Sequence, residues 1–318
     1  MISVIIATYN GEKYINQQIE SVLSQNTPVD EIIICDDNSK DNTIFVARSI
    51  LQKWDAHYKI IQHNENKGVV QSFYDAFNIS ENEYVFFSDQ DDVWLPNKTE
   101  EFMAAFNKFD CDLVFSDAEL TDAFLNPMGT TLLETKSRIK IANGVSQIDT
   151  YELSRVLPYG NMVTGMSMAA KREFVLKCCP FPNEMLHDNW IALNACAKGT
   201  MVSINMPLAY YRQHENNVIG AKKGGFFKKL NHSLETGENG IKKELSYADC
   251  IKNIYTSATN NVSIDSANEY CDFVEKRFDY HERKIGIVEL FRLYKCGLYR
   301  KFYTNRGFEF LIRDIIVL

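Results

Sequence analysis

The 318-residue sequence lacks the glycine-rich signatures by which many proteins bind nucleotides. It contains neither G-x-G-x-x-G nor G-x-x-x-x-G-K-[ST], which are typical of dinucleotide-binding folds and of P-loop nucleoside triphosphatases. If the chain binds a nucleotide, other groups must therefore hold it, and carboxylates together with a metal ion are the alternative that the sequence offers.

Targeting, membrane-spanning and metal-binding cysteine signals are also missing. The eight cysteines form no C-x-x-C pair, which argues against structural zinc and favours buried thiols in a reducing compartment. No run of about 18 apolar residues could span a bilayer. The first ten residues, MISVIIATYN, lack the basic region of a signal peptide. We therefore expect a cytoplasmic protein.

The chain has no excess of positive charge. Its formal net charge is −8, which argues against nucleic acid as a partner. The charge is unevenly spread, because residues 1–219 carry 17 Lys and Arg against 29 Asp and Glu, whereas residues 220–318 carry 17 against 13. This change in composition predicts two regions, 1–220 and 221–318.

The first hundred residues alternate between two patterns. Short β-branched runs occur at SVIIAT, EIIICD, YKIIQH and YVFFSD, and segments with apolar residues at helical spacing separate them. Apolar runs with little internal alternation indicate strands covered on both faces. The pattern therefore predicts an α/β fold with a mostly parallel sheet flanked by helices, whose ligands bind at the carboxyl ends of the strands.

The pattern is less regular after residue 110. Residues 126–150 are predicted to be mostly loop, a candidate flexible insertion, while GMSMAAKREFVLKC predicts a strand then a helix. HDNWIALNACAKG predicts a helix that ends at Gly199. Residues 221–318 are predicted to be helical. Their last part, 283–318, has eight Lys and Arg against three Asp and Glu, which favours peripheral contact with an anionic membrane or an ordinary helical cap.

Acidic residues crowd the end of the YVFFSD run. Asp89, Asp91 and Asp92 repel one another, and a hard divalent cation such as Mg²⁺ or Mn²⁺ would relieve that repulsion while binding substrate phosphates. A solvated acidic turn is the alternative. Asp37 ends an earlier predicted strand, where a carboxylate can accept a nucleobase N–H or a ribose hydroxyl.

Several segments, in order, resemble inverting nucleotide-sugar glycosyltransferases of the GT-A family 2. They are TYNGEKYINQQIESVLSQ, EIIICDDNSKDNT, NENKGVVQSFYDAF and YVFFSDQDDVWLPNK, and the resemblance covers about residues 1–220. SDQDDVW, HDNW and YRQHENNV resemble bacterial rhamnosyltransferases that build surface polysaccharides. The resemblance implies the GT-A fold, a Mg²⁺ or Mn²⁺ cofactor and a nucleotide-sugar donor.

The resemblance also implies roles for individual residues. It places the following residues at the nucleotide: Thr8, Tyr9, Asn10, Asp37, Lys67 and Asp89. In the family D-x-D motif, Asp89 contacts ribose and Asp91 holds the metal, but a second alignment makes Asp91 the ribose contact and Asp92 the ligand. His214 in YRQH matches a position that can reach the metal or the diphosphate.

Asp188 in HDNW matches the catalytic base of inverting members. A single displacement needs one base to deprotonate the acceptor hydroxyl, and the alternative role for Asp188 is that of a helix N-cap. The candidate donor and acceptor contacts are Gly165, Asn189, Trp190 and Arg212. Trp190 could instead belong to the core, Gly165 to a tight turn, and His214 could be structural.

The predicted function is transfer of a sugar, with L-rhamnose from dTDP-rhamnose as the best candidate, to a glycan or lipid-linked acceptor in cell-surface polysaccharide synthesis. A UDP-hexose or UDP-HexNAc donor is the first alternative. A non-catalytic nucleotide-sugar-binding protein would need a broken motif, and none is visible. A nucleotidyltransferase would need a glycine-rich basic loop after the first strand, where TYNGEKY offers one Gly and one Lys.

Overall fold

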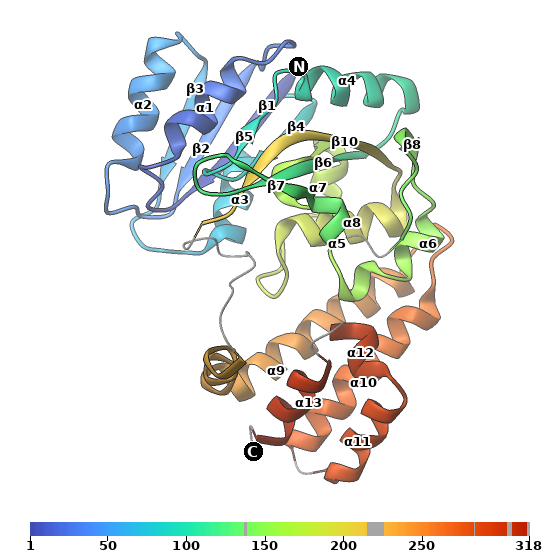
Figure 1. Ribbon diagram of the computed structural model, residues 1–318. Coiled ribbons are helices and arrows are strands. Elements are labelled where there is room, and N and C mark those ends of the chain that lie inside the picture. Colours follow the sequence, from blue (N-terminus) through green and yellow to red (C-terminus); the bar gives the residue numbers. More distant parts are fainter. Residues whose placement is uncertain (137–138, 215–225, 283, 304–306, 317–318) are drawn as a thin grey trace.

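The computed structural model describes residues 1–136, 139–214, 226–282, 284–303 and 307–316. An α/β region with a central sheet forms one part of the molecule, and a group of helices formed by the end of the chain lies below it in Figure 1. The predicted fold class is confirmed, with a sheet that is parallel in its first half and mixed in its second half.

Four parallel strands form the first half of the sheet in the order β3-β2-β1-β4. These strands are β1 (Ile2–Thr8), β2 (Glu31–Asp36), β3 (Tyr58–Gln62) and β4 (Tyr84–Ser88). Every residue of β1, β2 and β4 is buried, as the unbroken apolar runs predict. The register pairs Thr8 with Asp36 and Ile6 with Ser88, so the carboxyl ends of these three strands lie together.

The helices that connect these strands cover the two faces of the sheet. They are α1 (Ile15–Leu23), α2 (Thr43–Lys53) and α3 (Val69–Asn78). In α1, Ile15, Ile19 and Val22 are fully buried, which confirms the face predicted from their spacing. α1 packs into the core on one side of the sheet with Val4, whereas α3 packs on the other side with Ile5.

The second half of the sheet has the order β4-β9-β6-β10-β5, with β7 beside β6 and β8 beside β10. Its elements are β5 (Val93–Trp94), α4 (Lys98–Phe109), β6 (Leu113–Thr121), β7 (Pro127–Thr131), α5 (Leu132–Lys136), β8 (Gly144–Gln147), β9 (Met168–Lys171) and β10 (Met201–Arg212). β9 runs antiparallel to both of its neighbours, so the regular βαβ pattern stops after β4.

The prediction that residues 126–150 are mostly loop is wrong for the part that the structure describes. β7 and β8 pair antiparallel with β6 and β10, and α5 buries Leu132 and Leu133. Such short elements are stabilised by pairing with distant strands, so their own sequence carries little periodicity. In this segment, β7 and β8 extend the sheet, and α5 ends at Lys136.

Short elements lead from this segment to the helix that carries the predicted base. They are α6 (Thr150–Ser154), η1 (Leu157–Tyr159), η2 (Gly165–Ser167), α7 (Arg172–Lys177) and α8 (His187–Lys198). The predicted strand and helix at 165–178 and the helix at 187–198 are confirmed. A Cβ at Gly199 would lie 2.9 Å from Phe174, so close packing explains this glycine.

The end of the chain is helical, as predicted. Its helices are α9 (Phe226–Thr256), α10 (Ile264–His281), α11 (Ile287–Lys295), α12 (Leu298–Tyr303) and α13 (Gly307–Ile316). The predicted boundary near residue 220 lies outside the described residues. None of the helices in the described ranges is both long and apolar enough to cross a membrane.

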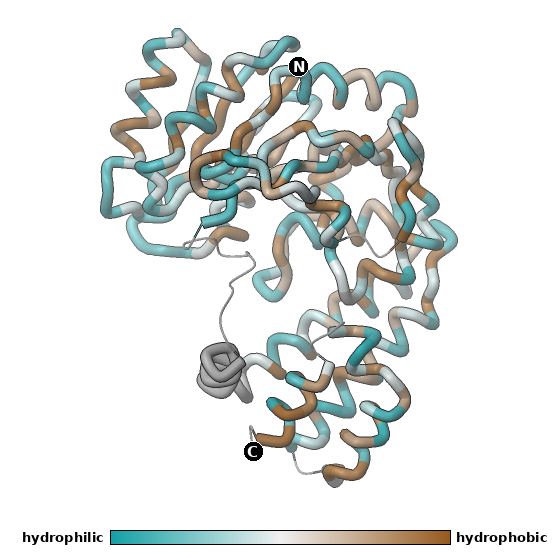
Figure 2. Tube along the Cα trace, viewed as in Figure 1, coloured by the Kyte–Doolittle hydropathy of each residue, from teal (hydrophilic) through white to brown (hydrophobic). Residues whose placement is uncertain are grey.

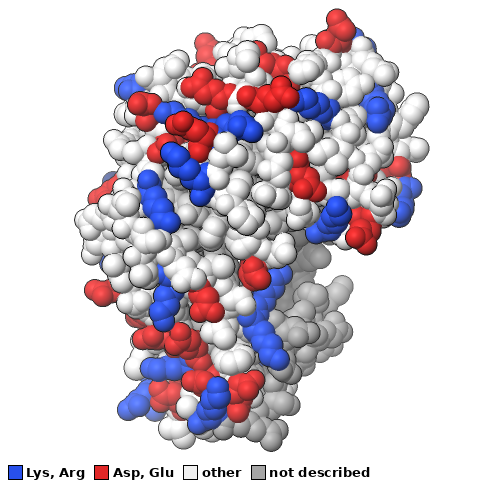
Figure 3. Space-filling model, turned by 180° about the vertical axis from the view of Figure 1, so that it is seen from behind, with Lys and Arg blue, Asp and Glu red and all other residues white. Residues whose placement is uncertain are grey.

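The C-terminal helices pack directly on the α/β region. The Tyr255 hydroxyl donates to the Ser154 carbonyl at 3.1 Å, and Asn260 Nδ2 donates to the Gly199 carbonyl at 2.7 Å. Buried side chains of α9 and α10 share one hydrophobic cluster with α8. The face of the molecule in Figure 3 carries acidic and basic side chains interspersed over both parts.

Candidate functional site

The carboxyl end of β1 is tied to the carboxyl end of β2. The Thr8 hydroxyl is buried and donates to Asp36 Oδ1 at 2.8 Å, and the same carboxylate accepts the Ser39 N–H at 2.9 Å. Thr8 therefore lies where a base pocket is predicted, but its hydroxyl is already used within the protein. Its direct contribution is to hold Asp36 and the turn that follows.

Asp37 occupies the turn after β2 and collects several hydrogen bonds. Its carboxylate accepts the backbone N–H of Lys67 at 2.7 Å and of Gly68 at 2.8 Å. Gly68 has a φ of 90°, which an L-residue rarely adopts, so glycine allows this turn. Lys67 and Asp37 are thus brought together, through the lysine backbone, while the Lys67 side chain is exposed.

His63 is a residue of this site that the sequence did not reveal. Its Nδ1 lies 2.9 Å from Asp37 Oδ1 and its Nε2 lies 2.9 Å from Asp75 Oδ2. The imidazole is buried between the two carboxylates and fixes the orientation of Asp37. The available signal was its place directly after the YKIIQ strand, at the same sheet edge as the other polar strand ends.

The rim of this edge is formed by Tyr9 and Asn10. The Tyr9 backbone exchanges two hydrogen bonds with the side-chain amide of Gln90, at 2.9 and 3.0 Å. Asn10 accepts the Lys40 N–H at 2.8 Å and has a φ of 49°, a left-handed conformation that asparagine tolerates. The Tyr9 side chain is 47% exposed, so its ring is available to a ligand.

The three carboxylates after β4 occupy different environments. Asp89 is half-buried, and its carboxylate has no hydrogen-bond partner within the described parts of the chain. Burial, followed by the charges of Asp91 and Asp188, raises the pKa of Asp89 to about 7. Asp92 is fully buried and uses Oδ1 to accept the Arg212 N–H at 3.0 Å. Burial raises the pKa of Asp92 well above its ordinary value.

Asp91 faces His214. The carboxylate Oδ2 lies 2.7 Å from His214 Nε2, and the imidazole stacks on the Tyr14 ring with 4.7 Å between centroids. The structure therefore brings together two residues that are 123 positions apart and that the sequence had assigned to one metal site. Tyr14, which supports the imidazole, was not identified from the sequence.

Arg212 is buried, and its guanidinium meets protein acceptors. It donates to the Asp91 carbonyl at 2.7 Å, to the Ala123 carbonyl at 2.9 Å and to Gln17 Oε1 at 2.7 Å. These bonds hold the backbone on either side of the acidic cluster. This geometry gives Arg212 a positioning role, and its contact with the donor stays a prediction.

The residues around Asp91 suit a hard divalent ion that is shared with a substrate. Within the described ranges, no group of three or more His, Cys, Asp and Glu side chains is arranged to hold a metal ion. Mg²⁺ commonly binds one or two protein carboxylates and takes further oxygens from phosphates and water. Asp91, which lies 2.7 Å from His214, could supply such a carboxylate.

A buried lysine lies under the acidic cluster. Lys98 is completely buried, donates to the Met166 carbonyl and has its Nζ 4.1 Å from the centre of the Trp94 ring. Burial lowers the pKa of Lys98 to about 7, whereas the charges of Asp92 and Asp89 act in the opposite direction. Lys98 was missed because an N-terminal helix residue after Pro96 and Asn97 looks exposed in sequence.

Asp188 lies in the first turn of α8, and it is not the N-cap. Leu186 is the N-cap residue, so the alternative cap role is excluded. Asp188 is 7% exposed, and its Oδ2 accepts the Gly165 N–H at 3.0 Å. Burial raises the pKa of Asp188, while the Lys136 ammonium and the Gly165 N–H lower it. Its charge in turn acts on Asp89, the first carboxylate of the acidic cluster.

Gly165 approaches α8 closely. A Cβ at this position would lie 2.9 Å from His187 Nε2, so a larger residue would displace the helix that carries Asp188. His187 stacks on Phe73 at 3.8 Å between centroids, and burial lowers its pKa to about 3. Gly165 thus positions the predicted base through its backbone.

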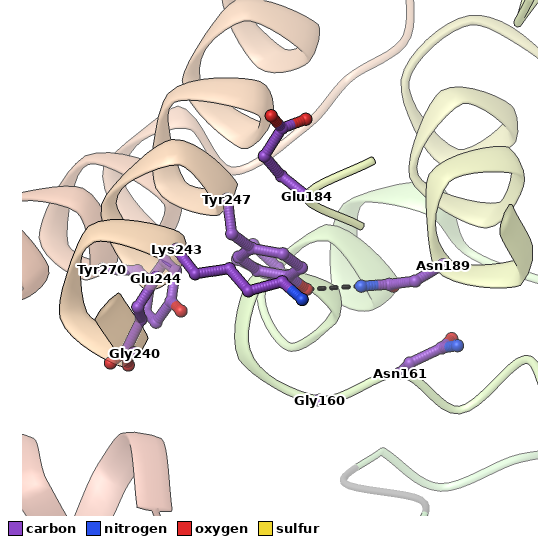
Figure 4. A pocket seen from close by; sticks show the side chains of 10 residues that line it. Gly160, Asn161, Glu184, Asn189, Gly240, Lys243, Glu244, Tyr247 and Tyr270 are labelled. Atoms are coloured by element: carbon purple, nitrogen blue, oxygen red, sulfur yellow. Dashed lines mark hydrogen bonds between the residues drawn. The ribbon is translucent and has the colours of Figure 1, made fainter. Parts of the chain in front are cut away.

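Asn189 and Trp190 point in different directions from α8. Trp190 Nε1 donates to the Cys178 carbonyl at 2.6 Å, which supports the core alternative for this residue. Asn189 Nδ2 donates to the Tyr247 hydroxyl of α9, as the dashed line in Figure 4 marks. Asn189 and Tyr247 line a cavity of about 360 Å³, together with Lys243. The contribution of α9 could not be read from the sequence.

Comparisons with known proteins identify the family of the chain. The family model described as Glycosyl transferase family 2 matches residues 3–178, more than half of the chain. The dTDP-rhamnosyl transferase RfbG of Shigella flexneri is 27% identical over 222 residues, which is 68% of this chain and 74% of that protein. The Escherichia coli UDP-Glc:alpha-D-GlcNAc-diphosphoundecaprenol beta-1,3-glucosyltransferase WfgD is 30% identical over 120 residues, 38% of this chain and 46% of that protein.

Solved structures show the same fold. Staphylococcus aureus TarS 1–349 in complex with UDP-GlcNAc superimposes with a TM-score of 0.61 at 16% identity, covering 88% of this chain and 73% of that one. The mannosyltransferase PcManGT of Pyrobaculum calidifontis, in complex with GDP-Man and Mn²⁺, gives a TM-score of 0.54 at 16% identity, covering 99% and 86%.

Proposed function

The chain belongs to glycosyl transferase family 2, and we propose that it transfers a sugar from a nucleotide-sugar donor to a glycan or lipid-linked acceptor with inversion at the anomeric carbon. The observation that carries the proposal is the convergence of Asp188 with the acidic cluster. The two segments are about a hundred residues apart, yet the charge of buried Asp188 acts on Asp89, as does that of Asp91, which lies 2.7 Å from His214.

Asp188 is the proposed base. In a single displacement, the acceptor hydroxyl loses its proton to the Asp188 carboxylate as its oxygen bonds the anomeric carbon and the bond to the diphosphate breaks. The Gly165 N–H and the first turn of α8 hold the carboxylate in place. Double-displacement glycosidases need a second catalytic carboxylate, whereas this mechanism needs one.

Asp91 and His214 are the proposed protein ligands of Mg²⁺ or Mn²⁺, and Asp89 is the proposed ribose contact. A divalent ion supplies positive charge to the diphosphate as it leaves. Asp92 is the weaker ligand candidate, because it is fully buried and one of its oxygens already accepts the Arg212 N–H. This arrangement favours the register in which Asp89 and Asp91 form the D-x-D pair.

Asp37, Thr8, Tyr9, Asn10 and Lys67 are the proposed nucleotide side of the site. Asp37 is held rigidly by the Lys67 and Gly68 N–H groups and by His63, which suits a carboxylate that must present one lone pair to a nucleobase. We propose dTDP-rhamnose as the donor, on the resemblance of three motifs and on the printed activity of RfbG. A UDP-hexose is the alternative, favoured by the activity of WfgD.

A thermal unfolding panel tests this proposal. dTDP-rhamnose, UDP-glucose and UDP-GlcNAc are each added with Mg²⁺ or Mn²⁺, and the expected result is a higher unfolding midpoint with one of them, because a ligand that binds the folded state stabilises it by mass action. No shift with any nucleotide sugar would overturn the proposal. Binding without turnover would favour a non-catalytic nucleotide-sugar-binding protein.

Residues 1–220 are the proposed catalytic region, and residues 221–318 are proposed as a helical region that contacts the cytoplasmic face of the membrane. On α11, Val288 is 78% exposed and Phe291 is 44% exposed, with Arg292 and Lys295 on the same helix. Figure 2 shows strongly hydrophobic positions on the C-terminal helices at the bottom of the view. An exposed apolar stripe beside basic residues suits an anionic bilayer surface.

Co-sedimentation with vesicles of phosphatidylglycerol and phosphatidylcholine tests the membrane contact. The double variant Val288→Ser/Phe291→Ser is expected to remain in the supernatant while the wild type pellets. Equal pelleting of the two proteins would remove this part of the proposal.

A further inference from the structure

α5 brings a lysine to the predicted reacting centre. Leu132 and Leu133 are buried, and the Leu133 N–H donates to Asp117 Oδ1 at 2.9 Å. α5 is therefore anchored to β6, and its last residue, Lys136, has a fixed direction. Lys136 is half-buried, and its charge interacts with those of Asp188 and Asp89.

The Lys136 ammonium is only partly satisfied by the protein. Its Nζ donates to the Thr164 hydroxyl at 3.0 Å. Among the described residues, Lys136 Nζ forms no ion pair with a carboxylate within 4 Å, and it donates no second hydrogen bond. An ammonium has three N–H groups, so two of them are left for a ligand or water.

Thr164 links this ammonium to the base. The next residue, Gly165, donates its N–H to Asp188 Oδ2 at 3.0 Å, so Lys136 and Asp188 meet on two consecutive residues of one turn. Burial lowers the pKa of Lys136, and the charges of Asp188 and Asp89 raise it. The ammonium is therefore linked to the predicted base through the Thr164–Gly165 turn, and its charge also acts on Asp89.

The carboxylates around this position would repel a diphosphate unless cations offset their charge. The charge of Asp91 acts on Asp89 and Asp92, and the charge of Asp188 acts on Asp89. On the side of Asp188, Lys136 is the cation that acts on the carboxylate. Preorganised positive charge aimed at a leaving group contributes strongly to rate in a site that excludes water.

We propose that Lys136 is a further catalytic residue, whose ammonium binds the donor diphosphate and offsets the charge that develops there. The acceptor oxygen bonds the anomeric carbon, its proton passes to Asp188, and the electron pair of the broken bond leaves on the phosphate oxygen that Lys136 contacts. This inference rests on the proposed function, because it needs a nucleoside diphosphate as leaving group.

Nucleotide affinity tests the inference without knowledge of the acceptor. UDP, dTDP, uridine and thymidine are titrated by calorimetry into the wild type, Lys136→Met, Lys136→Arg and the matched control Lys140→Met, with Mg²⁺ present. Lys140 lies four residues further in the same segment and is exposed. We expect Lys136→Met to weaken diphosphate binding by about 10- to 100-fold, as for loss of a hydrogen bond to a charged group.

The nucleosides distinguish a phosphate contact from a structural effect. Uridine or thymidine should bind equally to wild type and Lys136→Met, Lys136→Arg should recover most of the diphosphate affinity, and Lys140→Met should match the wild type. Diphosphate affinity within twofold of wild type in Lys136→Met would overturn the inference. If Lys136→Met does not fold, Lys136→Gln replaces it. A wild type that binds neither UDP nor dTDP would instead overturn the proposed function.

Discussion

The proposed nucleotide side and the proposed base side of the site are constructed differently. On the nucleotide side, Asp37 lies next to a strand end and is held by backbone N–H groups and a buried imidazole. On the base side, Asp188 and Lys136 come from separate short elements, and the lysine keeps N–H groups free of described partners. In this proposal, the rigidly held Asp37 recognises the nucleotide, whereas Asp188 takes up a proton and Lys136 offsets charge during the reaction.

This comparison predicts that base-side substitutions change turnover, whereas nucleotide-side substitutions change affinity and stability. Asp188→Asn should lower kcat by about 10²- to 10⁴-fold, the range of general-base catalysis. Asparagine retains an oxygen that accepts the Gly165 N–H, so the unfolding midpoint and the donor dissociation constant should change little. Steady-state kinetics and calorimetry measure the two effects, with exposed Asp265→Asn as the control. Full turnover in Asp188→Asn would refute the base assignment.

The metal pair should show the next largest effect. His214→Asn removes the imidazole that lies 2.7 Å from Asp91 and should raise the Mn²⁺ concentration for half-maximal activity by about 10- to 100-fold. A titration of activity against Mn²⁺ measures this. If the midpoint of that titration does not move, His214 has the structural role of a ring stacked on Tyr14.

Asp37→Asn changes the proposed nucleotide side, so it should lower stability and nucleotide affinity. It removes the charge that receives two backbone N–H groups, and charge-assisted bonds contribute about 1.5–3 kcal/mol. Chemical denaturation should show a loss of this order, and the nucleotide affinity should fall with it. Unchanged stability combined with lost turnover would contradict the division between the two sides.

The pH dependence follows from the raised pKa of Asp188. The carboxylate must be ionised to act as a base, so kcat should fall with decreasing pH at a value above 3.8, the ordinary aspartate pKa. Because the folded state holds the proton more tightly than the unfolded state, the Asp188 contribution lowers stability as pH rises through the window between 3.8 and the raised pKa. Lys136→Met should move the acidic limb of the rate profile to higher pH, and an unmoved limb would contradict the electrostatic link.

Tyr247→Phe should have the smallest effect. It removes the hydroxyl that bonds Asn189 and costs about 1 kcal/mol, typical of one neutral hydrogen bond. The acceptor KM is expected to rise a few-fold while the donor KM stays constant. An equal change in the acceptor KM and the donor KM would contradict a role of Tyr247 on the base side of the site.

The residues of the proposed nucleotide side could be grouped from the strand pattern of the sequence, whereas those of the proposed base side could not, for a physical reason. Thr8, Asp37 and Asp89 directly end apolar runs, and parallel strands bring their carboxyl ends to one edge. The register is then sufficient to place them together. Asp188 was identified from its family motif, because no local pattern connects it with Asp89.

The residues that were missed depend on tertiary pairing. Lys136 is the last residue of a short helix that is anchored to β6, and Tyr247 lies on α9, which meets Asn189 only in the folded protein. His63 and Lys98 are buried by neighbours distant in sequence. The sequences around these residues show neither a hydrophobic periodicity nor a motif that would indicate a functional site.

The anomeric configuration of the transferred sugar tests the central claim most directly. The product is made with the donor that stabilises the protein and with a glycan or lipid-linked acceptor, and NMR reads the configuration of the new glycosidic bond. Direct displacement with Asp188 as the only base predicts the configuration opposite to that of the donor. Retention of the donor configuration would contradict the account.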